Sequence, residues 1–196
     1  MRTQLTVTTE SMTAYAARRR TLLGTLTGTV LEIGAGAGAN FADFRSDIKW
    51  LGLDPDPGRS RKLAATAAAY GQRAPVITAP AERIPLADAS ADAVVATAVL
   101  CSVADQDQVL AEVRRVLRPS GAFVFFEHVP APAGTWSYRL QRCWAPVSRR
   151  LDGCDPGRQT WRAIEAAGFR EVLARWYTRR PGFSLYNPVL GGIAYV

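Results

Sequence analysis

The feature that most constrains the fold is an apolar, strand-like run that ends in alternating glycines. Residues 29–41 read Thr-Val-Leu-Glu-Ile-Gly-Ala-Gly-Ala-Gly-Ala-Asn-Phe. A glycine-rich turn after a buried strand brings backbone N–H groups close to a ligand, because these residues carry no Cβ. In an open α/β sheet this turn lies at the carboxyl end of a strand, where nucleotides bind. The stretch therefore predicts a nucleotide-like ligand, with a ligand-free glycine turn as the alternative.

The glycines fit two different ligand fingerprints. Residues 34–39 match the dinucleotide pattern G-x-G-x-x-A, with Asp54 at about the expected distance for a carboxylate that binds ribose. Residues 32–38 also match E/D-x-G-x-G-x-G. Glu32 separates the two, since a carboxylate beside the turn suits a ligand with a cationic amino-acid end and repels a pyrophosphate. The second pattern is therefore preferred.

Length and composition predict one globular domain, residues 1–196, with a full core. The chain has 24 Lys and Arg against 17 Asp and Glu, but its arginines are scattered, so no nucleic-acid partner is expected. Its three cysteines show no C-x-x-C spacing and it has one histidine, so no metal site and a reduced, cytoplasmic protein are expected. No signal peptide or membrane span is predicted, and the oligomeric state is left open.

Strand patterns alternate with helix patterns along the chain. Strands are expected at 29–33, 49–54, 75–79, 91–100, 122–128, 170–177 and 189–196, and helices at 11–28, 39–44, 56–71, 105–117 and 160–167. Residues 1–10 are expected to be flexible. The alternation, closing on two strands without a further helix, predicts a doubly wound, Rossmann-like α/β sheet that is mostly parallel with a C-terminal antiparallel strand.

Residues 129–150 carry aromatic side chains at helical spacing. They predict an amphipathic helix that either covers the site as a lid over an apolar substrate or packs into the core. Trp136 and Trp144 would contact the substrate if the segment is a lid. Tyr15, on the helix before the first strand, could also reach the ligand, with ordinary packing as the alternative.

Four segments together resemble the class I S-adenosylmethionine-dependent methyltransferases. They are the glycine motif at 32–38, the acidic strand end at Asp54, residues 81–86 with the Ala-Glu pair that contacts adenine in the family, and the turn at 117–121, where serine replaces the first glycine of L-x-P-G-G. After the fourth strand the chain is also similar to the alkyl thiol S-methyltransferases. That likeness rests on residues 99–103, 112–119, 127–129, 152–154 and 160–161.

The resemblance implies an enzyme that binds S-adenosylmethionine and releases S-adenosylhomocysteine. The residues expected to bind the cofactor are Glu32, Gly34, Ala35, Gly36, Gly38, Asn40, Asp54, Pro55, Ala81, Glu82 and Thr97. For Asp54 the alternative is a second helix-capping acid.

A thiol acceptor is favoured, and it must react as the thiolate. His128, at the carboxyl end of the fifth strand, is the candidate catalytic base, with a purely structural histidine as the alternative. Cys101 is expected beside the substrate. Methylation of a phenol, quinone or phospholipid head group at O, N or C is the first alternative. An NAD(P)-dependent oxidoreductase is more remote, because a Tyr-x-x-x-Lys pair is absent from the sequence.

Overall fold

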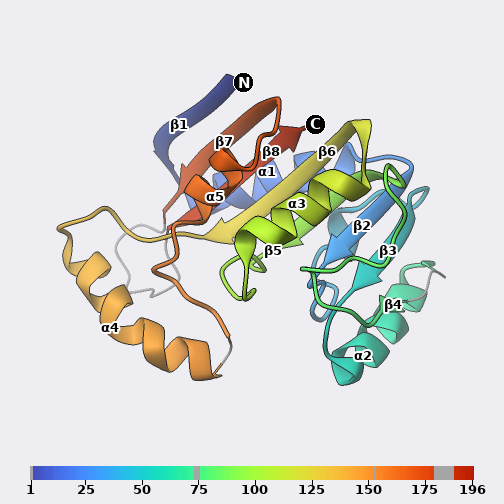
Figure 1. Cartoon of the computed structure of the whole chain (residues 1–196), viewed down its shortest axis with the longest axis horizontal. Coiled ribbons are helices and arrows are strands. Elements are labelled where there is room, and N and C mark those ends of the chain that lie inside the picture. The colour runs from blue at the N-terminus through green and yellow to red at the C-terminus, as the bar shows by residue number, and fades with distance from the viewer. Residues whose placement is uncertain (1, 73–75, 152, 179–187) are drawn as a thin grey trace.

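A central mixed sheet organises the molecule, which the computed structural model describes for residues 2–72, 76–151, 153–178 and 188–196 (Figure 1). The eight strands lie in the order β1-β7-β8-β6-β5-β2-β3-β4. They are β1 (Arg2–Glu10), β2 (Thr29–Ile33), β3 (Lys49–Leu53), β4 (Val76–Ile77), β5 (Ala91–Thr97), β6 (Leu117–His128), β7 (Glu171–Tyr177) and β8 (Val189–Tyr195). β8 runs antiparallel to both β6 and β7, whereas the other paired strands are parallel. This confirms the predicted sheet.

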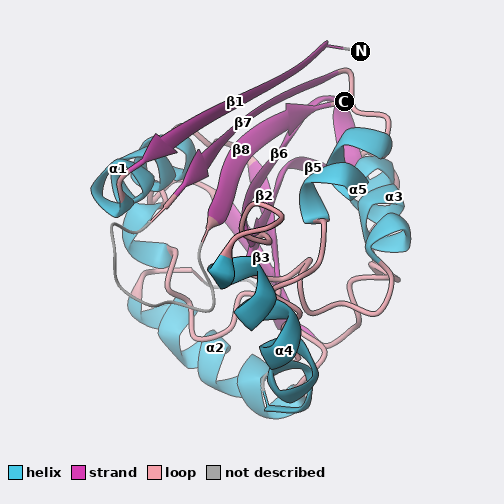
Figure 2. Cartoon of the chain, turned by 90° about the vertical axis from the view of Figure 1, so that its left-hand side faces the viewer, coloured by secondary structure: helices cyan, strands magenta, loops and turns pink. Residues whose placement is uncertain are grey.

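Helices cover both faces of the sheet, as Figure 2 shows, with α1 and α2 on one side and α3 and α5 on the other. The helical segments are α1 (Met12–Gly24), the 3₁₀ turn η1 (Phe41–Asp43), α2 (Pro57–Ala69), α3 (Gln106–Val116), α4 (Trp136–Leu151) and α5 (Thr160–Ala166). None of the helices in the described ranges has the length and apolar character needed to cross a membrane.

The alternation of side chains along β5 explains the two layers. Val94 packs in the core cluster on the side of α3 and α5, and Val95 packs in the cluster on the side of α1 and α2. Both side chains are fully buried, because a central parallel strand is covered on each face. The continuous apolar run that predicted this strand has that physical origin.

Acidic caps start two of the helices. The Asp56 carboxylate accepts hydrogen bonds from the N–H groups of Gly58 and Arg59 at 2.7 and 3.1 Å, ahead of Pro57 in the first turn of α2. Asp105 caps α3 in the same way. These caps fix where the chain leaves the carboxyl edge of the sheet.

The N-terminal segment differs from its prediction. Residues 2–10, expected to be flexible, form β1, which pairs parallel to β7. β8 pairs with one edge of β7, and the threonine-rich β1 pairs with the other edge, whose backbone groups would otherwise have no strand partner.

Other boundaries also differ. The helix expected at 11–28 ends at Gly24, and the strand expected at 122–128 already begins at Leu117, directly after α3. The helix expected at 39–44 is the single 3₁₀ turn η1, because the chain turns again within a few residues. The strand expected at 75–79 is β4, and Pro75 lies outside the described residues. The strand expected at 91–100 ends at Thr97, since Ala98 has φ of 55° and leaves the extended conformation.

Candidate active site

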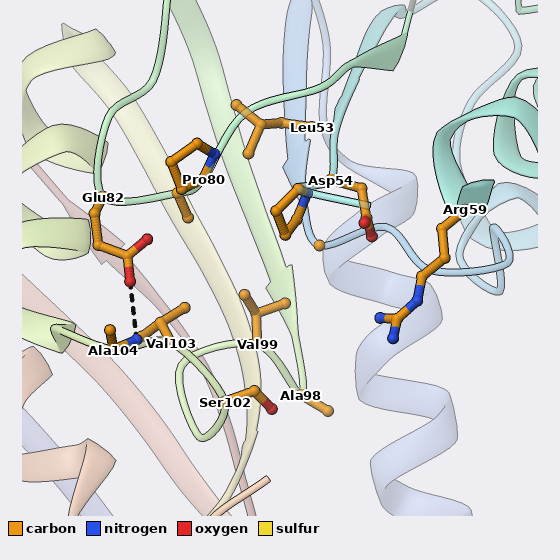
Figure 3. A pocket seen from close by; sticks show the side chains of 13 residues that line it. Leu53, Asp54, Arg59, Pro80, Glu82, Ala98, Val99, Ser102, Val103 and Ala104 are labelled. Atoms are coloured by element: carbon orange, nitrogen blue, oxygen red, sulfur yellow. Dashed lines mark hydrogen bonds between the residues drawn. The ribbon is translucent and has the colours of Figure 1, made fainter. Parts of the chain in front are cut away.

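A cavity of about 320 Å³ opens at the carboxyl edge of the sheet (Figure 3). It lies among the turns that follow β2, β3 and β5 and the loop that follows β4. Its lining residues are Gly34, Leu53, Asp54, Pro55, Arg59, Pro80, Ala81, Glu82, Ala98, Val99, Ser102, Val103 and Ala104. Open α/β sheets bind ligands at this edge, so the cavity lies where the glycine turn predicted a ligand.

The cavity brings together part of the predicted cofactor set. Gly34, Asp54, Pro55, Ala81 and Glu82 all line it. In Figure 3 Asp54 lies on one side of the cavity and Glu82 on the other. These residues come from three turns that are distant in sequence and meet because their strands end at the same edge.

Gly34 packs closely against Val99, in the turn that follows β5. Its φ is 58°, and a Cβ at this position would lie 2.6 Å from Val99 Cγ2. Any larger residue would therefore collide with the cavity wall and strain the backbone. The glycine is required by this close approach.

Asp54 presents one carboxylate oxygen to the cavity. Its residue is 2% exposed, and its Oδ1 accepts a hydrogen bond from the Asp56 N–H at 2.9 Å. Among the described residues no other hydrogen bond to this carboxylate is seen, so Oδ2 is available to a hydroxyl donor. This geometry suits the diol of a ribose.

The Glu82 side chain connects two segments of the cavity wall by hydrogen bonds. Its Oε1 accepts the N–H of Ala104 at 2.9 Å, drawn in Figure 3, and that of Asp105 at 3.4 Å. The loop after β4 is thereby joined to the start of α3. The adenine contact expected for Ala81 and Glu82 would form on this side of the cavity, where the loop after β4 is bonded to the start of α3.

Glu32 is not among the residues that line the cavity, and its contact with a ligand stays a prediction. It is 2% exposed, and its two oxygens accept hydrogen bonds from Asn40 Nδ2 and Trp50 Nε1, each at 2.8 Å. Asn40 Nδ2 also donates to Thr97 Oγ1 at 3.0 Å. Burial raises the pKa of Glu32 to about 7. These hydrogen bonds stabilise the glycine turn on the side that faces away from the cavity.

The remaining residues of the glycine motif also lie outside the cavity lining. Ala35 is buried in the core cluster beside α1 and α2. Gly36 and Gly38 both have positive φ, and a Cβ on Gly38 would lie 2.5 Å from Phe41 Cε2. These residues shape the turn, and only Gly34 among the motif residues reaches the cavity.

A second polar group lies next to the cavity, formed by Cys101, His128 and Cys154 and called here the Cys–His–Cys cluster. His128 Nδ1 is 3.7 Å from Cys101 Sγ and 3.5 Å from Cys154 Sγ, and the two sulfurs are 3.2 Å apart. Cys101 Sγ is 3.6 Å from the Oγ of Ser102, a cavity residue. The cluster therefore adjoins the cavity at the end of β6.

Glu127 fixes the turn that carries Cys101. It is fully buried, and its carboxylate accepts the N–H groups of Val99 at 3.0 Å and Cys101 at 3.4 Å. Burial raises the pKa of Glu127 to about 7. The hydrogen bond with the Cys154 thiol, together with burial, raises the pKa of the Cys101 thiol.

The other predicted substrate residues are spread out. Tyr15 packs edge-on against Phe126 and Tyr177, at ring-centroid distances of 5.4 and 5.5 Å, as the packing alternative expected. Trp136 is 71% exposed, on a helix that Figure 1 shows standing beyond the carboxyl end of β6. Trp144 is half-buried, and its indole Nε1 has no hydrogen-bond partner within the described part of the chain.

Sequence reasoning missed several residues of this edge. The missed cavity residues are Leu53, Arg59, Pro80, Ala98, Val99, Ser102, Val103 and Ala104. Ala98 and Val99 directly follow β5, a position that could have identified them. Arg59 lies in the first turn of α2 beside its cap. Cys154 lies in one of the segments that carry the family resemblance, but its contact with Cys101 and His128 had no sequence signal, because they are 53 and 26 residues away.

Comparison with known proteins agrees with this geometry. A family model described as "Methyltransferase domain" matches residues 31–125. Thiol S-methyltransferase TMT1A of Homo sapiens is 38% identical over 170 residues, which cover 85% of this chain and 70% of that protein. Thiol S-methyltransferase TMT1B of Homo sapiens is 42% identical over 147 residues, 73% of this chain. The chain spans only 60% of the length of TMT1B.

Solved structures share the architecture. A SAM-dependent methyltransferase from Aquifex aeolicus superposes with a TM-score of 0.62 at 17% identity, covering 92% of this chain and 87% of that one. The cyclase SpnF superposes with a TM-score of 0.66 at 25% identity, covering 85% and 61%. Because a cyclase shares the fold, architecture alone does not decide the reaction.

Proposed function

Since the chain belongs to the thiol S-methyltransferase family of the class I methyltransferases, we propose that it transfers the methyl group of S-adenosylmethionine to the sulfur of a small, largely apolar thiol. The observation that carries the proposal is the contact between the two halves of the site. Ser102 lines the cofactor cavity, and its Oγ lies 3.6 Å from the sulfur of Cys101 in the Cys–His–Cys cluster. The cavity that would hold the methyl donor and the sulfur-rich cluster that would face the acceptor are thus adjacent.

The cavity residues fit an adenosyl group. Asp54 Oδ2 would accept hydrogen bonds from the ribose hydroxyls, and the apolar side chains of Leu53, Val99 and Val103 would pack on the adenine ring. The volume of about 320 Å³ lies at the lower end of the usual range for ligand sites. When bound, S-adenosylmethionine supplies a methyl group that its sulfonium has already activated.

The protein's own task is to align the acceptor and to bring it to the thiolate form. We assign His128 to the formation of the thiolate, because it ends β6 within the cluster. Trp136 and Trp144 would cover an apolar acceptor from α4.

Label transfer tests this function. The reduced protein is incubated with methyl-labelled S-adenosylmethionine and a panel of thiols, phenols and amines, with Asp54→Ala as the control for cofactor binding. We expect label in thiols, with phenols and amines at background. Label found in phenols or amines instead would assign O- or N-methylation, and no label in any acceptor would overturn the proposal.

A further inference from the structure

We infer that Cys101, His128 and Cys154 form a binding site for a thiophilic divalent cation of the zinc class, with a fourth coordination position open to the acceptor thiol. The cation site stands on the geometry of the three side chains. Only the occupant of the fourth position rests on the proposed function.

Two of the three ligand-atom separations already match those that one cation imposes, and the third is slightly short. Tetrahedral zinc binds sulfur at about 2.3 Å and imidazole nitrogen at about 2.0–2.1 Å, which sets neighbouring ligand atoms roughly 3.5–3.8 Å apart. The measured separations are 3.7 and 3.5 Å from His128 Nδ1 to the two sulfurs and 3.2 Å between the sulfurs. A shift of about half an ångström of one thiol would bring the sulfur–sulfur separation into the same range.

Hydrogen bonds from the surrounding backbone hold the ligands in place. Cys101 lies in the turn that Glu127 clamps through the N–H groups of Val99 and Cys101. The N–H of Asp155, the residue after Cys154, donates to the Cys101 carbonyl at 2.9 Å. The segment carrying Cys154 is thereby attached directly to the segment carrying Cys101.

Arg149 adds a further restraint from α4. Its guanidinium pairs with the Asp155 carboxylate at 2.7 Å. Two loops and a strand end are therefore joined around the ligand atoms.

The number of ligands indicates a site that can do chemistry. Structural zinc sites have four protein ligands, whereas catalytic sites have three and one exchangeable position. Within the described ranges, the ligand group consists of these three side chains. The remaining cysteine, Cys143, is exposed on α4 and lies outside the group.

The open position suits the proposed acceptor. A thiol RSH would bind there as RS⁻ and release its proton to solvent, because a metal-bound thiol is deprotonated at neutral pH. A sulfur lone pair then attacks the methyl carbon, the carbon–sulfonium bond breaks, and its electron pair stays on the departing S-adenosylhomocysteine. The product RSCH₃ is neutral, so it binds the cation more weakly and leaves.

Cobalt and zinc titrations test the site without any substrate or cofactor. Apo-protein is prepared under reducing conditions and titrated with Co²⁺, whose thiolate charge-transfer absorption reports sulfur ligation, and Zn²⁺ is then used to displace it. We expect one Co²⁺ per chain in the wild type and in the control Cys143→Ser. Cys101→Ser and Cys154→Ser should each weaken binding by about a hundredfold or more.

Folding and oxidation are controlled separately. Circular dichroism and S-adenosylhomocysteine binding report whether each variant folds, and His128→Asn, at a half-buried position, carries the test if a serine variant does not. Equal binding by wild type and cluster variants would overturn the inference. So would a wild type that binds no metal, including one in which Cys101 and Cys154 form a disulfide.

The fourth position has its own readout. Adding a small thiol to the Co²⁺ protein should change the cobalt spectrum of the wild type, and an unchanged spectrum would show that the position is closed to thiols. Because these measurements need no methyl transfer, metal binding without thiol methylation would overturn the proposed function and leave the cation site standing.

Discussion

The indole Nε1–H of Trp50 donates a 2.8 Å hydrogen bond to the buried carboxylate of Glu32. This bond joins β3 to the strand that leads into the glycine turn. Asn40 donates to the other oxygen of the same carboxylate from the far side of the turn. The acidic residue of the glycine motif is therefore part of the frame that holds the glycine turn beside the cavity.

The stability of the protein should fall between about pH 4.5 and 7 because of Glu32. Burial raises the pKa of this carboxyl from 4.5 to about 7, so the folded chain holds the proton more tightly than the unfolded chain does. Its stabilising contribution is complete below pH 4.5 and is lost as pH rises through 7, a change of up to about 3 kcal/mol.

Glu32→Gln isolates this effect in urea unfolding across the pH range. Glutamine cannot ionise, and a rotated Asn40 amide can accept from its NH₂ group through Oδ1, which has no partner among the described residues. The wild type should lose stability relative to the variant as pH rises, and Glu127 contributes equally to both. A stability difference that stays constant with pH would contradict the prediction.

Asp54→Ala should weaken S-adenosylhomocysteine binding by about ten- to a hundredfold. The change removes a charged acceptor from the ribose hydroxyls, a loss of about 1.5–3 kcal/mol. Isothermal calorimetry measures it, with NAD as the comparison ligand that we expect not to bind. Unchanged affinity in a folded variant, or tight NAD binding, would show that Asp54 does not recognise this cofactor.

His128→Asn should lower kcat/KM for a thiol acceptor by about a hundredfold or more near neutral pH, while S-adenosylhomocysteine affinity survives. As a cation ligand, His128 is needed at every pH, so the deficit should persist up to pH 9. Rate profiles over pH with matched metal analyses check this. A deficit that disappears near the thiol's own pKa, about 8.5 for a cysteine-like acceptor, would instead assign proton transfer to the imidazole.

Trp136→Ala should raise the KM for an apolar acceptor by about tenfold, as expected when an indole that covers the acceptor is removed. Trp136 is 71% exposed, so thermal unfolding should hardly change. Leu151→Ala, at a 74% exposed apolar position on the other end of α4, is the matched control. If both variants have the wild-type KM, α4 is not a lid.

Local sequence patterns predicted most of the architecture. Strand and helix periodicity depends on neighbouring residues, so the central sheet and its antiparallel C-terminal strand could be read directly. The caps at Asp56 and Asp105 accept hydrogen bonds from residues no more than three positions away, so a local pattern is enough to predict where these two helices begin. The strand formed by residues 2–10 was missed because it depends on a free edge of β7, which no local pattern describes.

The residues of the site also fall into two groups, those that local sequence patterns identified and those that only the tertiary structure brings together. Gly34 and Asp54 could be assigned to the cavity from sequence, because each directly follows a strand and parallel strands end at one edge. The inward role of Glu32 depended on the indole of Trp50, 18 residues away on the next strand. Only the tertiary structure decided that Cys101, His128 and Cys154 meet. They lie 26 and 27 residues apart on three segments, and their contact is created by the β5–β6 pairing and the return of the chain after α4.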